Sequence, residues 1–137
     1  MDTLNSTQRS HRMSLIRAKN TKPEMLVRRL IHGMGYRYSL HSAKLPGKPD
    51  LVFRKRKKVI FVHGCFWHRH PSTRCKLARL PKSRKGFWVK KLEDNRKRDV
   101  DKQRELRKLG WNVLVIWECQ LKNTKALERK IGGFLSQ

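Results

Sequence analysis

Acidic residues are scarce in this chain, which has ten Asp and Glu residues against 35 Lys and Arg residues in 137 positions. The formal net charge of +25 is spread along the sequence and is not confined to one tail. Such an excess of positive charge repels itself in a compact fold and attracts polyanions. Nucleic acid is therefore the expected partner, ahead of an anionic membrane. An RNA binder of the ribosomal type would carry a similar charge, so the charge predicts a class of partner and leaves the activity open.

Long apolar segments are also missing, since no stretch approaches the roughly 20 apolar residues that cross a bilayer. The opening segment MDTLNSTQRSHR lacks the apolar core of a secretion signal. These absences predict a soluble protein of the bacterial cytoplasm or nucleoid with no membrane partner. A chain of 137 residues has room for one domain with one core. We expect a monomer in which residues 1–19 form a polar, basic arm and residues 20–137 form the domain.

Cysteine occurs only three times, as Cys65, Cys75 and Cys119. An odd count in such a chain disfavours a framework of disulfide bonds and favours metal binding or simple burial. His70 lies midway between Cys65 and Cys75, so three thiolates and one imidazole are available for a closed, tetrahedral zinc site. Four ligands without an open position would make the ion structural. The spacing is not the usual C-x-x-C, and the alternative is a set of buried free thiols.

The apolar pattern predicts a mixed α/β fold. Thr21 and Glu24 have the spacing of a helix N-terminal capping box, and Gly35 is expected to end that helix. Val59–Val62 is a continuous apolar run, typical of a strand buried on both faces. The expected elements are a helix from Thr21 to Gly35, strands at 36–41, 50–53 and 59–62, an ordered loop at 64–84, a helix at about 86–109, a buried strand at 112–117 and a helix at 124–135. This order predicts a three-layer α/β domain.

Pro49-Asp50 stands at the start of an expected strand, about a dozen residues before Val59–His63. Many nucleases hold Mg²⁺ against a phosphate with a carboxylate at a strand start and polar groups on the next strand. The common form of this motif has an acid and a lysine two residues apart on the second strand. Phe61 and His63 occupy those places here, so the usual pattern is broken. The alternative is a simple turn aspartate after a proline.

Aromatic residues stand close to basic ones at Phe66-Trp67 and at Phe87-Trp88. Such side chains stack on nucleic-acid bases or wedge between them. Hydrophobic packing under the long loop is the alternative, and Trp111 and Trp117 are expected in the core. A separate basic turn is expected to contact the nucleic-acid backbone through Arg54, Lys55, Arg56, Lys57 and Lys58.

Three histidines, His63, His68 and His70, lie near these possible metal ligands. Histidine is a general base near neutral pH, although a surface or phosphate-contacting histidine is the alternative for each of them. Asn95 and Asp99 are four residues apart on one face of the long helix. Asp99 is able to orient a histidine through a hydrogen bond, and a solvated helix carboxylate is the alternative.

Together these segments resemble the very short patch repair (Vsr) DNA mismatch endonucleases. The resemblance runs from about Ser10 to Leu121, and HGCFWH at residues 63–68 with the later WEC at residues 117–119 is its most specific part. Its other matching parts are LPGKPD at residues 45–50, VIFV at residues 59–62, Arg69-His70, Phe87-Trp88, Asn95, Arg98-Asp99 and Gly110-Trp111.

The family resemblance implies a restriction-endonuclease-like fold with an αβββαβ core. It also implies Mg²⁺-dependent hydrolysis of the phosphodiester on the 5′ side of T in a T:G mismatch, the product of 5-methylcytosine deamination. Double-stranded DNA carrying that mismatch is the implied substrate, and mismatch-repair proteins are possible partners.

The resemblance further implies roles for single residues. The catalytic set comprises the Mg²⁺ ligands Asp50 and the main-chain carbonyl of Val62, the general base His68 with Asp99 behind it, Glu24 at the metal's water shell, and His63 supporting the scissile phosphate. The structural zinc ligands are Cys65, His70, Cys75 and Cys119. The wedge inserted beside the mismatch is formed by Phe66, Trp67 and Trp88, while the arm before residue 20 clasps the other groove.

Two positions depart from the family's usual pattern. Val62 stands where relatives often have threonine, a change that a main-chain metal contact tolerates. The segment between His70 and Cys75 varies in length, which affects the assignment of Cys75. Two rival hypotheses stay open. The first is a non-catalytic, zinc-stabilised nucleic-acid binder, which has no need of Asp50. The second is a restriction-type or structure-specific nuclease of the same fold without mismatch preference, against which the wedge aromatics argue.

Overall fold

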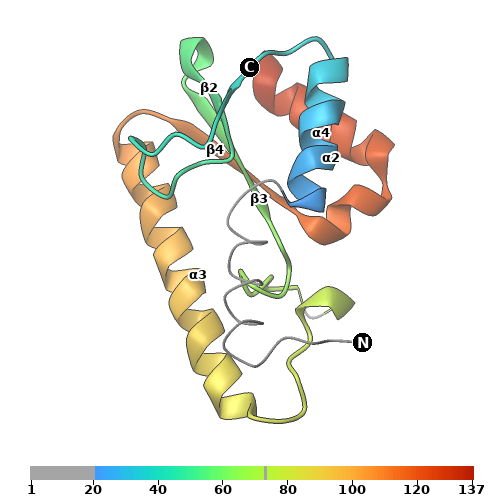
Figure 1. The fold of residues 1–137 in the computed structure, drawn as a ribbon. Coiled ribbons are helices and arrows are strands. Elements are labelled where there is room, and N and C mark those ends of the chain that lie inside the picture. The colour runs from blue at the N-terminus through green and yellow to red at the C-terminus, as the bar shows by residue number, and fades with distance from the viewer. Residues whose placement is uncertain (1–20, 73) are drawn as a thin grey trace, which may run out of the picture.

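The computed structural model describes residues 21–72 and 74–137, so the predicted arm at 1–19 lies outside the described residues. The described elements are helix α2 (Lys22–Gly33), strands β1 (Ser39–Leu40) and β2 (Leu51–Phe53), the 3-10 helix η1 (Arg54–Arg56), strand β3 (Lys58–His63), the 3-10 helix η2 (Lys76–Ala78), helix α3 (Lys85–Lys108), strand β4 (Asn112–Trp117), the 3-10 helix η3 (Glu118–Lys122) and helix α4 (Thr124–Ser136). Their order agrees with the predicted one (Figure 1).

Helix α2 begins where the capping pattern predicts. The hydroxyl oxygen of Thr21 accepts a hydrogen bond from the backbone N–H of Glu24 at 3.3 Å, which satisfies one of the free donors of the first turn. The helix ends at Gly33, and Gly35 follows with a φ of +96°, a conformation that glycine adopts without strain. The strand predicted at 36–41 is only the exposed pair Ser39–Leu40, at the edge of the sheet.

The four strands form one sheet in the order β1-β2-β3-β4. Strands β1, β2 and β3 pair antiparallel, and β4 pairs parallel to β3 after the crossover through α3. All six residues of β3 are buried, which confirms the prediction from its apolar run. The prediction of a buried strand at 112–117 was wrong. Strand β4 lies at the sheet edge, and Ile116 is its one buried residue.

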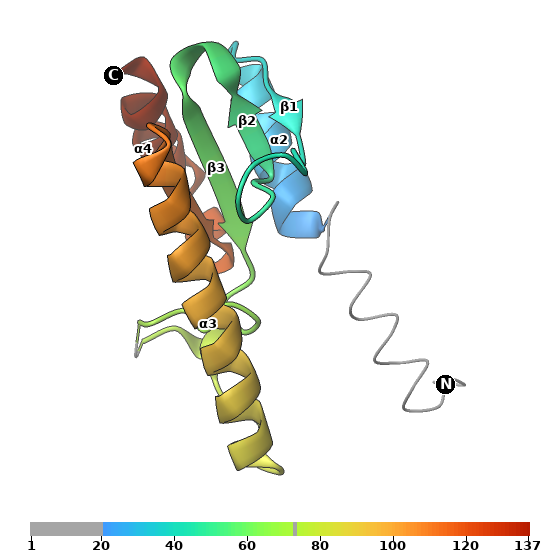
Figure 2. The ribbon, with the colours of Figure 1, turned by 90° about the vertical axis from the view of Figure 1, so that its left-hand side faces the viewer.

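Alternating side chains of β2 and β3 supply two cores, one on each face of the sheet. Leu51 and Ile60 pack in the larger cluster with α2 and α4. Val59 and Phe61 pack on the opposite face, against Leu106 of α3. The fold is therefore the predicted three-layer arrangement, with α3 on one face and α2 and α4 on the other (Figures 1 and 2).

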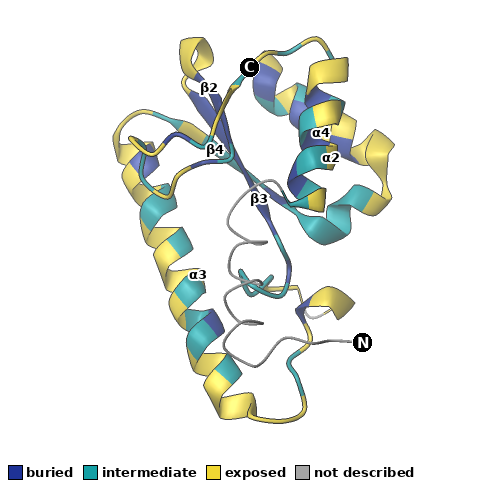
Figure 3. Ribbon diagram, viewed as in Figure 1, coloured by how far each residue is buried: buried dark blue, intermediate teal, exposed yellow. Residues whose placement is uncertain are grey.

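Helix α3 extends beyond one end of the strands (Figures 1 and 2). Its C-terminal half covers the strands, while its N-terminal half continues past their ends beside the segment 64–84 (Figures 1 and 2). The projecting half is mostly exposed or partly buried (Figure 3). Leu92 is its fully buried residue. The segment and this half of the helix lie near each other beyond the end of the sheet (Figures 1 and 2). None of the helices described is long and apolar enough to cross a membrane.

The basic turn at Arg54–Lys58 lies at the opposite end of the β2–β3 hairpin from Asp50 and His63. Lys58 is only 3% exposed, and its ammonium group donates hydrogen bonds to the carbonyl oxygens of Phe134 and Gln137. The guanidinium of Arg56 donates to the carbonyl of Leu135 at 2.9 Å.

These two cations therefore satisfy the free carbonyls at the C-terminus of α4. The expectation that the whole turn contacts DNA is not met for Lys58, whose charged group is buried. Arg54, Lys55 and Lys57 are exposed on the same turn.

Candidate active site and metal centre

Asp50 directly precedes β2, and the antiparallel pairing places it beside the end of β3. Its Oδ2 atom accepts a hydrogen bond from the backbone N–H of Val62 at 2.7 Å. Burial raises the pKa of Asp50 to about 7, the Val62 hydrogen bond opposes this shift, and the neighbouring Glu24 adds to it. A partly buried carboxylate with a raised pKa beside a second acid is a site that would gain from a cation.

Glu24 lies in the first turn of α2 and is 2% exposed. Its Oε2 atom accepts hydrogen bonds from the guanidinium of Arg28 at 3.2 Å and from Nε2 of His41 at 2.7 Å. One ligand atom each from Glu24, His41 and Asp50 lie within 4.8 Å of one another. Two carboxylates and an imidazole at this separation are suited to a hard divalent cation such as Mg²⁺.

His68 and Asp99 form the second half of the site. Nδ1 of His68 lies 2.6 Å from Oδ2 of Asp99 on α3. Asn95, one turn earlier on α3, donates to the main-chain carbonyl of Trp67 at 3.1 Å and so ties the loop to the helix. With Nδ1 donating to Asp99, Nε2 of His68 keeps its lone pair and is free to accept a proton.

His63 lies beneath His68, with the ring centroids 3.9 Å apart and the planes nearly parallel at 4°. It is 4% exposed, and its Nδ1 has no partner within the described part of the chain. Burial, with the nearby His68 as a smaller cause, lowers the pKa of His63 well below its usual value, so the ring is neutral. The expected direct support of a phosphate by His63 does not fit this position, because the ring is covered.

A pocket of about 340 Å³ joins the two halves of the site. Glu24, Asp50, Val62 and His68 all line it, and Trp67 forms part of its wall. Four parts of the chain thus meet in one cavity: the start of α2, the residue before β2, the end of β3 and the segment that follows β3. The pocket combines acid ligands for a cation with an oriented histidine, which is what phosphodiester hydrolysis requires.

Cys65, His70, Cys75 and Cys119 come together in a separate cluster. One ligand atom from each lies within 4.8 Å of the others. The backbone N–H of Cys119 donates to the sulfur of Cys65 at 3.4 Å, and the sulfur of Cys119 lies 3.6 Å from Nδ1 of His70. Burial raises the pKa of the Cys65 thiol to about 12.

Three sulfurs and one imidazole nitrogen fit a soft, tetrahedral cation such as zinc. A bound cation would supply the charge that Cys65 needs to become a thiolate in this buried position. The cluster joins the start of the 64–84 segment to η3 after β4. It therefore holds the loop that carries His68.

The three aromatic residues expected in the wedge also meet. The ring centroids are 5.0 Å apart for Phe66 and Trp67, 5.4 Å for Phe66 and Trp88, and 6.1 Å for Trp67 and Trp88. All three side chains are partly exposed, and Phe87 beside them is 48% exposed. This aromatic cluster, Phe66–Trp67–Trp88, adjoins the pocket through Trp67.

Trp117 lies between the histidine pair and the cysteine cluster. Its ring stacks on His70 at 4.3 Å between centroids and meets His63 edge-on at 5.2 Å. The tryptophan was expected to be plain core, and this expectation was wrong. It contacts His63 of the histidine pair and His70 of the cysteine cluster.

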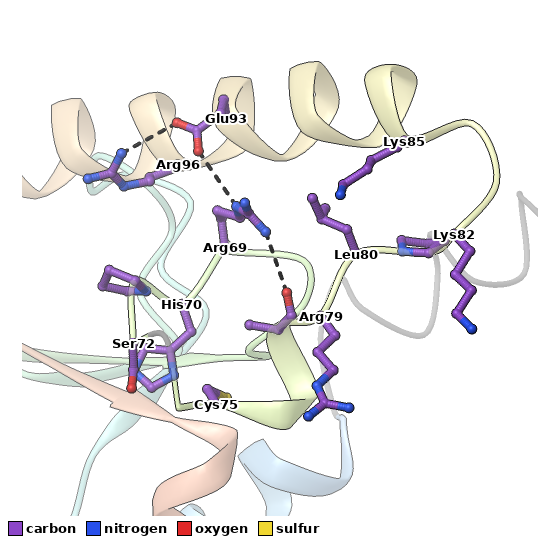
Figure 4. A pocket seen from close by; sticks show the side chains of 13 residues that line it. Arg69, His70, Ser72, Cys75, Arg79, Leu80, Lys82, Lys85, Glu93 and Arg96 are labelled. Atoms are coloured by element: carbon purple, nitrogen blue, oxygen red, sulfur yellow. Dashed lines mark hydrogen bonds and ion pairs between the residues drawn. The ribbon is translucent and has the colours of Figure 1, made fainter.

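A larger hollow of about 820 Å³ lies between the loop and α3 (Figure 4). Arg69 reaches across it, with Nε 3.6 Å from a carboxylate oxygen of Glu93, and its guanidinium donates to the carbonyl of Ala78 at 3.5 Å. Arg96 pairs with the same Glu93 at 3.4 Å. The outer ends of Arg79, Lys82 and Lys85 stand apart around the rim (Figure 4). The hollow thus contains an ion pair, Arg69–Glu93, that links the loop to α3. The charged ends of Arg79, Lys82 and Lys85 are separated from one another and do not form a joint anion site (Figure 4).

The sequence reasoning missed two residues of the candidate site, His41 and Glu118. His41 is a single histidine after a short strand, and no motif marks it. Glu118 lines the pocket and belongs to the WEC segment, so its position in that segment was the available signal.

Comparison with known proteins identifies the family of the chain. A family model described as "DNA mismatch endonuclease Vsr" matches residues 1–74. The chain is similar to the "Type II nicking enzyme V.XorIIP" of Xanthomonas oryzae, at 47% identity over 98% of this chain and 96% of the relative. It is also similar to the "Type II nicking enzyme V.NmeAIP" of Neisseria meningitidis, at 43% identity over 94% of this chain and 89% of the relative.

A third relative is the "DNA mismatch endonuclease Vsr" of Escherichia coli, at 38% identity over 92% of this chain and 79% of the relative. The matches to these relatives span nearly the whole chain, and they confirm the family resemblance seen in the motifs. The chain belongs to the Vsr family of DNA mismatch endonucleases and is a DNA endonuclease.

Proposed function

We propose that the protein nicks one strand of duplex DNA on the 5′ side of the T in a T:G mismatch, with Mg²⁺ as its catalytic metal. The pocket that combines Asp50, Glu24 and His68 is the observation that carries this proposal. The relatives named as nicking enzymes and as a mismatch endonuclease support single-strand cleavage and mismatch preference, respectively.

His68 handles the proton in this scheme. Its Nε2 accepts a proton from a water molecule as the water oxygen forms a bond to phosphorus and the backbone phosphorus–oxygen bond breaks. The sugar oxygen that leaves takes up a proton from solvent. Asp99, 2.6 Å from Nδ1, holds the ring in the required tautomer and stabilises the positive charge that the ring gains. His63 beneath it keeps the ring from tilting and in this way supports the phosphate indirectly.

Asp50 would hold the metal together with the main-chain carbonyl of Val62, and Glu24 would orient its water shell. The carboxylate oxygens fit the preference of Mg²⁺ for hard ligands. When bound, the cation offsets the negative charge that grows on the phosphate during cleavage. A second ion, zinc, is proposed in the Cys65–His70–Cys75–Cys119 cluster, where four soft ligands give it a structural role.

The aromatic cluster provides a physical basis for mismatch preference. Separating two stacked base pairs costs a few kcal/mol, and less where one pair is mismatched. The cluster adjoins the pocket through Trp67, so inserting its rings beside a weak pair would bring the phosphate next to Asp50. Mispaired DNA is then preferred without every base edge being read.

The decisive experiment is cleavage of labelled duplexes that carry each mismatch in turn, with Mg²⁺ and with a matched duplex as control. The expected product is a single nick 5′ of T in the T:G duplex. Asp50→Asn is the inactive control variant, which should still bind DNA. Equal cleavage of matched DNA would favour a nuclease without mismatch preference. Tight binding with no cleavage of any duplex would contradict the enzymatic proposal.

A further inference from the structure

His41 has a backbone conformation that is uncommon for residues other than glycine. It follows β1 with a φ of 45°, in the left-handed region, where a side chain with a Cβ atom is disfavoured. Its backbone N–H donates to the carbonyl oxygen of Asp50 at 3.2 Å. Strain of this kind persists where the surrounding structure needs the residue in one place.

The side chain of His41 points to the other acid of the pocket. Nε2 lies 2.7 Å from Oε2 of Glu24, which also accepts from Arg28 at 3.2 Å. Glu24 is 2% exposed, so its carboxylate relies on protein donors rather than on water. Two donors on one oxygen from different directions fix the plane of the carboxylate and its rotation about the last side-chain bond.

His41 therefore contacts both acids of the pocket, Asp50 through its main chain and Glu24 through its ring. We propose that His41 is a positioning residue of the divalent-metal site, which holds Glu24 and Asp50 at the separation that lets them serve one cation. This inference rests on the proposed metal site at Asp50. The ligand atoms of all three residues lie within 4.8 Å of one another, so a small shift of Glu24 would change the site.

Binding of Mn²⁺ to the zinc-loaded protein without DNA tests the proposal separately from catalysis. Free Mn²⁺ is measured by electron paramagnetic resonance, and its preference for oxygen ligands keeps it from competing for the cysteine cluster. His41→Gly suits the left-handed backbone and removes the ring. His41→Gln keeps a nitrogen donor at a similar reach. His32→Gln, at an exposed histidine on α2, is the matched control.

Losing one charge-assisted hydrogen bond should weaken Mn²⁺ binding by about tenfold in His41→Gly. His41→Gln and His32→Gln should bind like the parent protein. The nicking rate of His41→Gly should recover partly at high metal concentration, because the loss lies in metal affinity. If the glycine variant does not fold, as judged by its circular dichroism, His41→Asn replaces it. Asparagine tolerates the left-handed conformation but is too short to reach Glu24.

Unchanged Mn²⁺ affinity in folded His41→Gly would overturn the proposal. Equal weakening in His41→Gln and His41→Gly would overturn it as well, because the imidazole nitrogen would then bind the ion directly. Asp50→Asn belongs in the same titration. If Asp50→Asn also binds Mn²⁺ like the parent protein, the proposed metal site itself is wrong. This variant therefore distinguishes a failure of the metal site from a failure of the role proposed for His41.

Discussion

Replacing Asp50 with asparagine should stabilise the metal-free fold while it removes activity. The Asp50 carboxyl has a folded-state pKa of about 7, raised from an ordinary value of 3.8 because burial disfavours its charged form. Asparagine has nearly the same shape and carries no charge at any pH. Its carbonyl oxygen is able to accept the hydrogen bond that the backbone N–H of Val62 donates to the aspartate. The substitution therefore removes the cost of burying the charge and keeps the contact.

The magnitude follows from the linkage between proton binding and stability. Between pH 4 and pH 7 the folded state holds a proton on Asp50 that the unfolded chain has released, so the free energy of unfolding falls as the pH rises. Each pKa unit corresponds to about 1.4 kcal/mol, which gives at most about 4 kcal/mol lost by pH 8. The asparagine variant lacks this loss. Its advantage should be close to zero at pH 4 and largest above pH 7.

Urea unfolding at about pH 4.5 and about pH 8, on zinc-loaded protein without added Mg²⁺, measures this difference on either side of the folded-state pKa. Asp101→Asn, at an exposed carboxylate on α3, is the matched control and should show no such pH-dependent gain. Saturating Mg²⁺ should narrow the difference at the higher pH, because the ion stabilises only the parent protein. Equal stability of Asp50→Asn and the parent at both pH values would refute the argument that burial of this carboxylate is costly.

Four further predictions address the other parts of the molecule. His68→Ala should reduce the nicking rate by roughly 10²-fold with nearly unchanged DNA affinity, and Asp99→Asn should have a smaller effect of the same kind; a loss of affinity with normal turnover would make His68 a phosphate contact. Cys119→Ser should lower the zinc content from one ion per chain and the melting temperature with it, and a folded, active parent protein without zinc would contradict this. Trp67→Ala should lose more activity on a T:G duplex than on a duplex already opened by a bulge, whereas equal losses with a lower melting temperature would indicate simple packing. Lys58→Met should destabilise the fold by about 2 kcal/mol while leaving DNA affinity unchanged, and a weaker salt dependence of DNA binding in this variant would contradict its structural role.

Local patterns predicted most of the fold. The buried strand at Val59–Val62 and the helix start at Thr21 depend on residues close together in the chain, so periodicity and capping suffice to identify them. The motif resemblance likewise brought Asp50 and His68 into one hypothesis. In the structure both of them line the same pocket.

Features created by distant parts of the chain were not predictable in this way. His41 contacts Glu24, 17 residues earlier in the chain, because the fold brings the end of β1 next to α2. A single histidine in the sequence does not predict such a contact. Lys58 looked like one more surface cation in a basic turn, yet the last residues of α4 cover it and use its charge. The exposure of β4 followed from its place at the sheet edge, which its apolar sequence does not reveal.

Trp117 contacts both the histidine pair of the candidate active site and the cysteine cluster. Its indole stacks on His70 of the cysteine cluster and contacts His63, which lies under His68. A side chain in contact with both sites offers a physical link between them, and any coupling of their free energies through it is reciprocal. Occupancy of the cysteine cluster should then bias the ordering of the histidine pair, and substrate held at that pair should tighten the cluster's hold on its ion. The proposed zinc ion would then influence catalysis in addition to holding the loop in place.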